Sequence, residues 1–299
     1  MLVWVAWTIV CTVWGSTWMA IHLGLQDVPL LLALGLRFSL AAAVLGVIVR
    51  ARHIPLPRTP DAVKVYLTLG MISLTVPFAL VYWGQQFIPT GLSSIVFAAY
   101  PFWVALFSHL LLRGERLNAF KVAGIAVGFV GLVVVFSGDA EASHPRALAG
   151  MGAILVATIM QGFSLIVVKR YGQPISPFAM NFVGMGIAAV LLLGSSLLVE
   201  RGMPVTWTPV AVGSVVYLAV VGSVLTFVSY YWLLKRIQAV YLSLTSFVNP
   251  IVAVMLGAVV LDESLPPAIV LGASMVLAGI LIANGNYLRT RAAERAEGP

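Results

Sequence analysis

The sequence contains few charged residues for its length. Only 9% of the 299 residues are Asp, Glu, Lys or Arg, whereas 61% are hydrophobic. The surface of a soluble domain faces water, and roughly a quarter of its residues are charged. The shortage of charge therefore excludes a soluble globular protein and places most of the chain in a lipid bilayer.

Cysteine and the motifs of nucleotide and metal chemistry are also scarce. Cys11 is the single cysteine, which excludes an internal disulfide. The sequence contains no Walker-type phosphate loop and no cluster of Cys and His spaced to hold a metal. We therefore expect no cofactor, no metal site and no hydrolysis of ATP.

Apolar runs of bilayer-spanning length are abundant. A transmembrane helix needs roughly 20 predominantly apolar residues, and such runs recur from end to end between charged, Pro and Gly residues. They predict an all-α polytopic membrane protein. The ten expected transmembrane helices lie near residues 2–22, 30–49, 63–82, 90–112, 119–137, 148–168, 177–198, 209–232, 239–261 and 266–287.

The basic residues lie mainly in the short loops between these runs. The net charge of +7 does not indicate a nucleic-acid partner, because the basic residues form no continuous stripe. If the N-terminus is cytoplasmic, only Arg146 and Arg201 fall in outer loops, and only Arg37 lies in the interior of a run, away from its ends. Basic residues prefer the cytoplasmic side of a membrane, so we predict that both termini are cytoplasmic.

The two halves of the sequence resemble each other. Phe78–Pro101 aligns with Phe227–Pro250 at a constant offset, which pairs Tyr82 with Tyr231. Each half holds five predicted helices, and this odd number makes the second copy enter the membrane with opposite polarity. Such inverted repeats enclose a substrate site near the bilayer midplane, and their rocking exposes it to each side in turn.

This repeat predicts how the chain is organised. Residues 1–138 form the first five-helix repeat, residues 147–288 form the second and inverted five-helix repeat, and residues 289–299 form a cytoplasmic tail. We expect a central cavity between the repeats, the lipid bilayer as the surroundings, and a small molecule as the partner. The sequence leaves open whether the protein is a homodimer or a monomer.

Several short motifs carry a resemblance to a known family. They are Trp14–Thr17 in the first helix, Arg37-Phe38 in the second, Pro101 in the fourth, and Gly114–Leu117 before the fifth. In their order and spacing the chain resembles the EamA-type drug/metabolite transporter superfamily, and within it a YddG-type amino-acid exporter. The resemblance implies export of amino acids, aromatic ones among them, and of related metabolites across a bacterial inner membrane.

The candidate substrate-binding residues combine aromatic rings with a few polar groups. Such a wall suits an amphipathic solute, and an amino acid fits that description. Each ring also has an alternative role in packing or at the membrane interface, and each serine can bond its own helix backbone. The candidates are Trp14, Arg37, Phe78, Tyr82, Phe97, Tyr100, Phe163, Tyr231, Ser243 and Ser246.

Arg37 and two prolines stand out within the apolar runs. A charged side chain inside a membrane helix is costly and usually faces a cavity, a partner or backbone carbonyls. Arg37 therefore attracts a substrate carboxylate, reaches the interface, or bonds the first helix. Pro101 and Pro250 each remove one helical hydrogen bond and bend their helices, either as hinges beside the cavity or as fixed curvature.

Acidic residues are absent from the middle of every run. All of them lie at run ends, in loops or in the tail, and His22 and His109 lie towards run ends. Proton coupling needs a titratable group at membrane depth, so the sequence favours facilitated or weakly coupled transport.

Two other functions are alternatives to an amino-acid exporter. A membrane-embedded enzyme would need a cluster of Asp, Glu or His at membrane depth, which the sequence lacks, so it is the weaker alternative. A sugar-phosphate or nucleotide-sugar transporter would need more cavity cations than Arg37.

Overall fold

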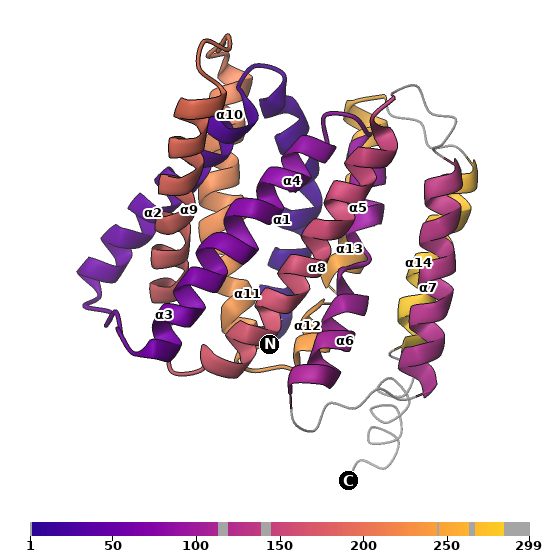
Figure 1. Ribbon diagram of the computed structural model, residues 1–299, viewed down its shortest axis with the longest axis horizontal. Coiled ribbons are helices and arrows are strands. Elements are labelled where there is room, and N and C mark those ends of the chain that lie inside the picture. The colour runs from indigo at the N-terminus through magenta and orange to yellow at the C-terminus, as the bar shows by residue number, and fades with distance from the viewer. Residues whose placement is uncertain (1, 113–118, 139–144, 244, 263–266, 284–299) are drawn as a thin grey trace.

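The structure is a computed structural model, and it describes residues 2–112, 119–138, 145–243, 245–262 and 267–283 (Figure 1). Every regular element in these ranges is a helix. Seven helical stretches are long and apolar enough to cross a membrane: Leu2–Leu25, Leu30–Ala51, Pro60–Gly84, Thr90–Leu111, Ala147–Tyr171, Pro177–Val199 and Pro209–Leu234. The prediction of an all-α polytopic membrane protein is confirmed at this level.

Some of these stretches are divided into shorter elements. In chain order the elements are α1 Leu2–Leu25, α2 Leu30–Ala51, α3 Pro60–Leu67, η1 Thr68–Thr75, α4 Val76–Gly84, α5 Thr90–Phe97, α6 Tyr100–Leu111, α7 Ala119–Gly138, α8 Ala147–Tyr171, α9 Pro177–Val199, α10 Pro209–Ala219, η2 Val220–Leu225, α11 Thr226–Leu234, α12 Ala239–Ser243, α13 Thr245–Val260 and α14 Pro267–Ala283. The last predicted run extends past residue 283, and the predicted tail at 289–299 lies outside the described residues.

Two of the long stretches contain a π-helical segment, η1 and η2. Thr75 Oγ1 donates to the carbonyl of Gly70 at 2.6 Å, five residues earlier. Thr226 Oγ1 donates to the carbonyls of Gly222 at 2.7 Å and Val221 at 3.2 Å. Such segments are rare and often occur at functional sites, and here both lie in the middle of the bundle.

The helices pack in pairs that join the two halves of the sequence. The most extensive contacts are those of α7 with α14, α2 with α9, α4 with α8, and α1 with α13. In Figure 1, α7 and α14 lie side by side at one edge of the molecule, next to the main bundle. The core is therefore made between the halves of the sequence and not within each half.

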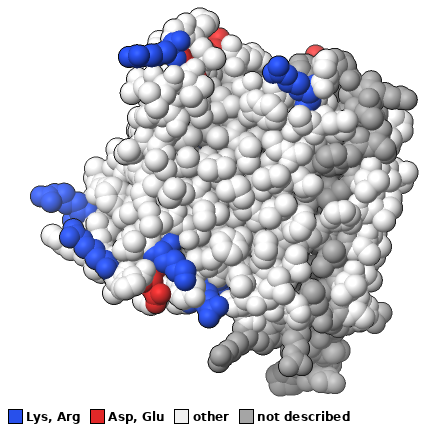
Figure 2. Space-filling model, in the orientation of Figure 1, with Lys and Arg blue, Asp and Glu red and all other residues white. Residues whose placement is uncertain are grey.

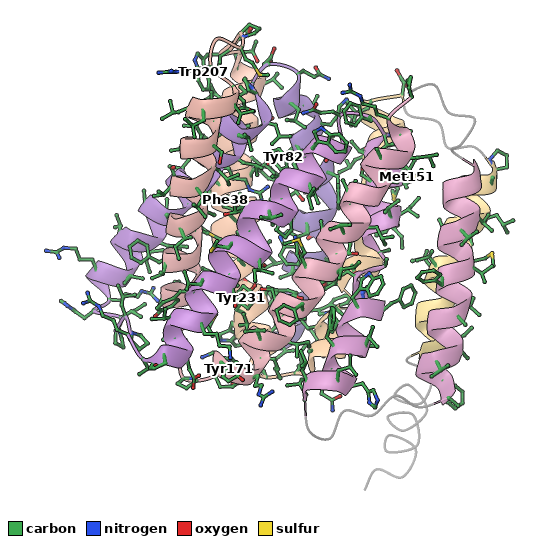
Figure 3. All side chains as sticks on the ribbon, viewed as in Figure 1. Phe38, Tyr82, Met151, Tyr171, Trp207 and Tyr231 are labelled. Atoms are coloured by element: carbon green, nitrogen blue, oxygen red, sulfur yellow. The ribbon has the colours of Figure 1, made fainter. Side chains whose placement is uncertain are left out.

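The two ends of the bundle differ in charge. Arg201 follows α9 at the end where α2 begins, and Arg146 precedes α8. Arg50, Arg52 and other basic residues lie at the opposite end, and Figure 2 shows these groups of blue side chains on the two sides of a largely uncharged surface. Figure 3 places Trp207 at the first end and Tyr171 at the second, where aromatic side chains favour membrane interfaces.

Two lysines close the end that carries most of the basic residues. Lys169 Nζ at the end of α8 donates to the carbonyls of Leu234 and Ile237, at 2.5 and 2.8 Å. Lys235 Nζ donates in return to the carbonyls of Gln173 and Ile175, at 2.6 and 2.5 Å. Burial lowers the pKa of Lys235, and the adjacent Arg236 lowers it further. The paired bonds tie the loops after α8 and α11 together.

Two carboxylates tie the other end together. Glu200 accepts hydrogen bonds from the backbone N–H groups of Leu31 and Leu32, at 2.8 and 2.9 Å, and so satisfies the first turn of α2. Thr208 donates to Asp27 at 2.5 Å across the neighbouring loops. These bonds link the loop after α1 to the segment between α9 and α10.

Packing of α14 on α7 depends on glycine. A Cβ atom added at Gly279 would lie 2.5 Å from both the carbonyl oxygen of Gly124 and the backbone nitrogen of Gly128. Backbone atoms cannot move aside as a side-chain tip can.

We therefore expect Gly279→Val to lower the free energy of unfolding by about 1–3 kcal/mol, measured by thermal or denaturant unfolding in detergent. The control is Gly194→Val, because a Cβ at Gly194 meets no atom within 4 Å. Equal stability of the two variants would contradict the expectation.

Candidate functional site

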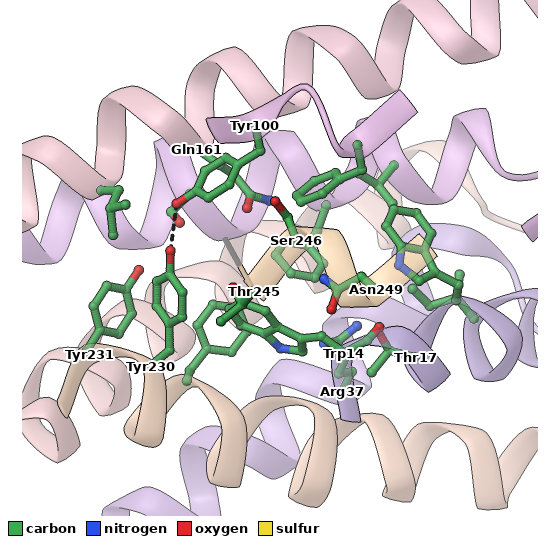
Figure 4. A pocket seen from close by; sticks show the side chains of 18 residues that line it. Trp14, Thr17, Arg37, Tyr100, Gln161, Tyr230, Tyr231, Thr245, Ser246 and Asn249 are labelled. Carbon is green, nitrogen blue, oxygen red and sulfur yellow. Dashed lines mark hydrogen bonds between the residues drawn. The ribbon is translucent and has the colours of Figure 1, made fainter. Parts of the chain in front are cut away.

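A cavity lies in the middle of the bundle, between helices from both halves (Figure 4). The space open to the centres of water molecules is about 70 Å³, several times the roughly 10–15 Å³ that one water needs. Its lining consists of Trp14, Thr17, Trp18, Ile21, Arg37, Ser73, Phe78, Val81, Phe97, Tyr100, Gln161, Leu165, Phe227, Tyr230, Tyr231, Thr245, Ser246 and Asn249.

Aromatic rings from four stretches of the chain form most of the wall. The Trp14 ring lies 5.2 Å from Phe227 and 4.8 Å from Tyr230, measured between centroids. Phe78 lies 6.1 Å from Phe227, which brings α4 and α11 together. Phe97 stacks on Tyr100 at 5.9 Å. These rings give the cavity flat apolar faces on which a planar or aliphatic group can pack.

The polar groups of α13 lie on one side of the cavity. Thr245 and Ser246 donate to backbone carbonyls three residues earlier in the chain, at 2.9 and 2.7 Å. The Asn249 amide, oriented with its nitrogen as donor, reaches the carbonyls of Thr245 and Cys11 at 3.1 Å. Each hydroxyl oxygen and the amide oxygen keep lone pairs that can accept a hydrogen bond from a solute.

Arg37 enters the cavity wall from α2. Its side chain is 1% exposed. Nε donates to Ser223 Oγ at 2.9 Å, and the terminal nitrogens donate to Tyr82 Oη at 3.1 Å and to the Gly222 carbonyl at 3.4 Å. The guanidinium carbon also lies 4.9 Å from the centre of the Phe78 ring, a cation–π arrangement. The π-helical segment η2 therefore supplies two of the three hydrogen-bond acceptors.

A hydrogen bond between two tyrosines crosses the other side of the cavity. Tyr100 Oη and Tyr230 Oη lie 2.8 Å apart, and both side chains are buried (Figure 4). Tyr100 belongs to α6 and Tyr230 to α11, so the bond joins the two halves of the sequence. Tyr231 lies beside them, with its ring centroid 5.5 Å from that of Tyr230.

The structure brings seven of the ten candidate residues to the cavity wall. These are Trp14, Arg37, Phe78, Phe97, Tyr100, Tyr231 and Ser246. Tyr82 lies behind Arg37 and contacts its guanidinium. Ser243 is buried one turn before Ser246, and its carbonyl accepts the Ser246 hydroxyl. Phe163 is not part of the wall: it is 36% exposed and packs on Phe107.

Helix geometry explains the position of Phe163. Gln161 lines the cavity from α8, and a residue two positions later points to a different face of a helix with 3.6 residues per turn. The prediction that Phe163 lines the cavity is therefore corrected in favour of Gln161. Thr17, the last residue of the Trp14–Thr17 motif, and Asn249, which precedes Pro250, also line the cavity.

Tyr230 is the most informative lining residue that the sequence did not reveal. The aligned repeats single out Tyr231, which matches Tyr82, whereas Tyr230 matches Val81. Both Tyr230 and Val81 line the cavity. The same alignment also pairs Tyr100 with Asn249, and both of these residues line the cavity. Pairing of positions between the repeats was therefore the signal in the sequence that could have found Tyr230.

The two prolines differ in their setting. The chain leaves α5 at Ala98, α6 begins at Tyr100, and Pro101 lies in the first turn of α6. Pro250 lies inside α13. Proline has no N–H for the carbonyl four residues earlier, and those residues are Phe97 and Ser246, both on the cavity wall.

A bundle of bilayer-length helices around a largely uncharged cavity is the architecture of a multi-pass membrane transporter. The profile of the EamA-like transporter family matches residues 2–137 and again residues 148–285. The chain belongs to this family of membrane transporters, and its members are transporters of small metabolites, which indicates a role other than catalysis.

Named relatives agree with this assignment. "Uncharacterized transporter YoaV" of Bacillus subtilis is 29% identical over 94% of this chain and 96% of its own. "Uncharacterized inner membrane transporter YedA" of Escherichia coli K12 is 28% identical over 92% and 89%. A "Probable terminal-alkyne amino-acid exporter" of Streptantibioticus cattleyicolor is 25% identical over 95% of each chain. A crystal structure with 21% identity shares the fold at a TM-score of 0.71, over 94% of this chain and 97% of that one.

The tyrosine pair can be tested by a double-mutant cycle. Tyr100→Phe or Tyr230→Phe leaves one buried hydroxyl unpaired, so each single variant should lose about 1–3 kcal/mol of unfolding free energy. Tyr100→Phe with Tyr230→Phe removes both hydroxyls and should be no less stable than either single variant. Denaturant unfolding in detergent measures all four proteins. Strictly additive losses would show that the two hydroxyls do not interact.

Proposed function

We propose that this transporter exports amino acids, aromatic and other neutral ones, by alternating access across a bacterial inner membrane. The observation that carries the proposal is the cavity itself, with ring walls, neutral hydrogen-bonding groups and one cation. An amino acid presents an apolar side chain, an ammonium and a carboxylate, and the wall offers a partner for each of these groups. The amino-acid exporter among the relatives adds support.

Within this proposal the seven lining candidates contact the substrate. The same role extends to Thr17, Gln161, Phe227, Tyr230 and Asn249, which share the wall. Tyr82 acts by holding Arg37, and Ser243 by holding Ser246. Pro101 and Pro250 serve as the points about which their helices bend.

The architecture behind the mechanism is ten membrane helices in two inverted repeats, residues 1–138 and 147–288. The two matches to the family profile support the duplication. The helix contacts are also consistent with it, because exchanging the repeats converts the α1–α13 pair into α8–α6, and maps α2–α9 and α7–α14 onto themselves. The basic end of the bundle is cytoplasmic in this arrangement, with both termini on that side.

Two other functions are weaker. A sugar phosphate or nucleotide sugar brings two or more negative charges, and Arg37 is the single cation on the described cavity wall. A membrane-embedded enzyme would need clustered carboxylates or histidines, and the described residues hold no group of three or more that could bind a metal. Membership in a transporter family also speaks against the enzyme.

The transport proposal predicts counterflow of labelled phenylalanine and other neutral amino acids into preloaded proteoliposomes. Ser246→Trp should abolish it, because the indole fills a cavity lined by the buried Ser246. Ser274→Trp is the matched control, since Ser274 is exposed on α14, and it should transport normally. Exchange of phosphorylated sugars with no amino-acid signal would instead establish the alternative substrate class.

The inverted repeat predicts opposite sides for two equivalent loops. Arg58 lies between the second and third helical stretches, and Met203 lies between the corresponding stretches of the other half. In a Cys11→Ala background, a membrane-impermeant maleimide should label Met203→Cys in intact cells and Arg58→Cys only after permeabilisation. Labelling of both from the same side would refute the inverted arrangement, and the reverse pattern would refute a cytoplasmic N-terminus.

A further inference from the structure

Arg37 differs from every other group on the described cavity wall because it carries charge. The other lining residues are aromatic, aliphatic, hydroxyl or amide side chains. Arginine stays a cation in proteins, and a cation held in the interior of a membrane protein usually has a partner or a function. The single charge in a neutral chamber therefore needs an explanation beyond packing.

The partners of Arg37 within the described part of the chain are all uncharged. Its three hydrogen bonds go to the hydroxyls of Ser223 and Tyr82 and to the Gly222 carbonyl. A guanidinium has five N–H donors, so these bonds leave two. The Phe78 and Phe38 rings, at 4.9 and 5.3 Å, lower the cost of the charge without neutralising it.

These contacts hold the guanidinium in place and bring no negative charge to neutralise it. Ser223 and Gly222 belong to η2, and Tyr82 belongs to α4, so elements of both halves fix its position. A planar guanidinium recognises a carboxylate through two parallel N–H···O bonds. In Figure 4, Arg37 lies beside Thr17 and Trp14, and the Trp14 ring lies 4.8 Å from that of Tyr230.

We propose that Arg37, positioned by Tyr82 and Ser223, forms a carboxylate-binding subsite that selects substrates by charge. This inference rests on the proposed transport function and adds that every good substrate carries a carboxylate. A carboxylate neutralises the buried cation, whereas a cationic amine or an ester leaves it uncompensated and adds repulsion. A phosphate dianion would leave an excess negative charge in the same chamber.

The bound carboxylate also fixes how the substrate lies. With its carboxylate at Arg37, the apolar part of the solute packs against Trp14 and Phe227. The substrate ammonium donates hydrogen bonds to the Ser246 hydroxyl and to the Asn249 amide oxygen. It also donates to the Ser246 carbonyl, because Pro250 has no N–H to pair with that carbonyl. The aromatic rings of the wall accept many different substrate side chains. The charge at one end of the substrate therefore affects binding more than the shape of its other end.

A purely structural role is the competing explanation. Arg37 contacts α4 and η2, and a residue that only links these elements would affect all ligands equally when replaced. A charge-selective subsite affects ligands according to whether they carry a carboxylate. The experiment therefore compares ligands that share one ring and differ in their charged groups, and it measures binding as well as transport.

The ligand panel is phenylalanine, its methyl ester, 3-phenylpropionate and phenethylamine. Binding is followed in detergent by intrinsic tryptophan fluorescence, to which Trp14 and Trp18 on the wall contribute, and transport by competition in proteoliposomes. We expect phenylalanine and 3-phenylpropionate to bind at least about tenfold more tightly than the ester and the amine, because a hydrogen-bonded charge pair contributes about 1.5–3 kcal/mol. Equal binding of phenylalanine and its ester would overturn the subsite.

Variants then assign the preference to Arg37. Arg37→Gln should weaken carboxylate binding by about tenfold or more without weakening the binding of the ester, so that the preference disappears. Arg37→Lys keeps the charge and should retain part of the preference. Tyr82→Phe, a milder change, should reduce the preference without removing it. Arg201→Gln, at the exposed end of the bundle, should bind all four ligands as the wild type does.

The outcomes separate this inference from the transport proposal. Uniform weakening of all four ligands in Arg37→Gln and in Tyr82→Phe would show a structural role and overturn the subsite. Amino-acid counterflow that accepts the methyl ester equally would overturn the subsite while the transport function stands. Counterflow of 3-phenylpropionate without any amino-acid counterflow would support the subsite and refute the proposed amino-acid function.

Discussion

The structure depends on one constraint, which is that a bilayer offers no hydrogen-bond partners to a polar group. Backbone groups meet it by forming helices, and the described elements are all helical. Polar side chains meet it by bonding backbone carbonyls, as Thr17, Ser94 and Thr158 do on their own helices. The Arg37 guanidinium donates hydrogen bonds to two hydroxyls and one carbonyl, and it packs against two aromatic rings.

This constraint also explains why irregular backbone is concentrated around the cavity. The π-helical segments η1 and η2 depart from the regular α-helical pattern, and a turn at Ala98 and Ala99 separates α5 from α6. Irregular backbone is tolerated at membrane depth only where it is buried in protein or lines a cavity. Gly222 illustrates the point, because its carbonyl accepts from Trp14, Arg37 and Thr226. The same irregularities shape the site and supply its polar atoms.

Hydrogen bonds join loops at both ends of the bundle, and the cavity lies between these two ends. Lys169 and Lys235 join loops at one end, and Glu200 and Asp27 join loops at the other. In the proposed alternating-access mechanism, one set of these bonds breaks while the other holds.

The sequence by itself determined the membrane class, the seven long helical stretches and the family, because each depends on residue type and on spacing along the chain. It also singled out Arg37, since a charge in an apolar run is visible without coordinates. Only the tertiary structure decided which neighbour faces the cavity: Gln161 and not Phe163, and Tyr230 together with Tyr231. The physical reason is rotation about the helix axis, which packing against other helices fixes, and which a π-helical segment such as η2 shifts away from the regular period of 3.6 residues.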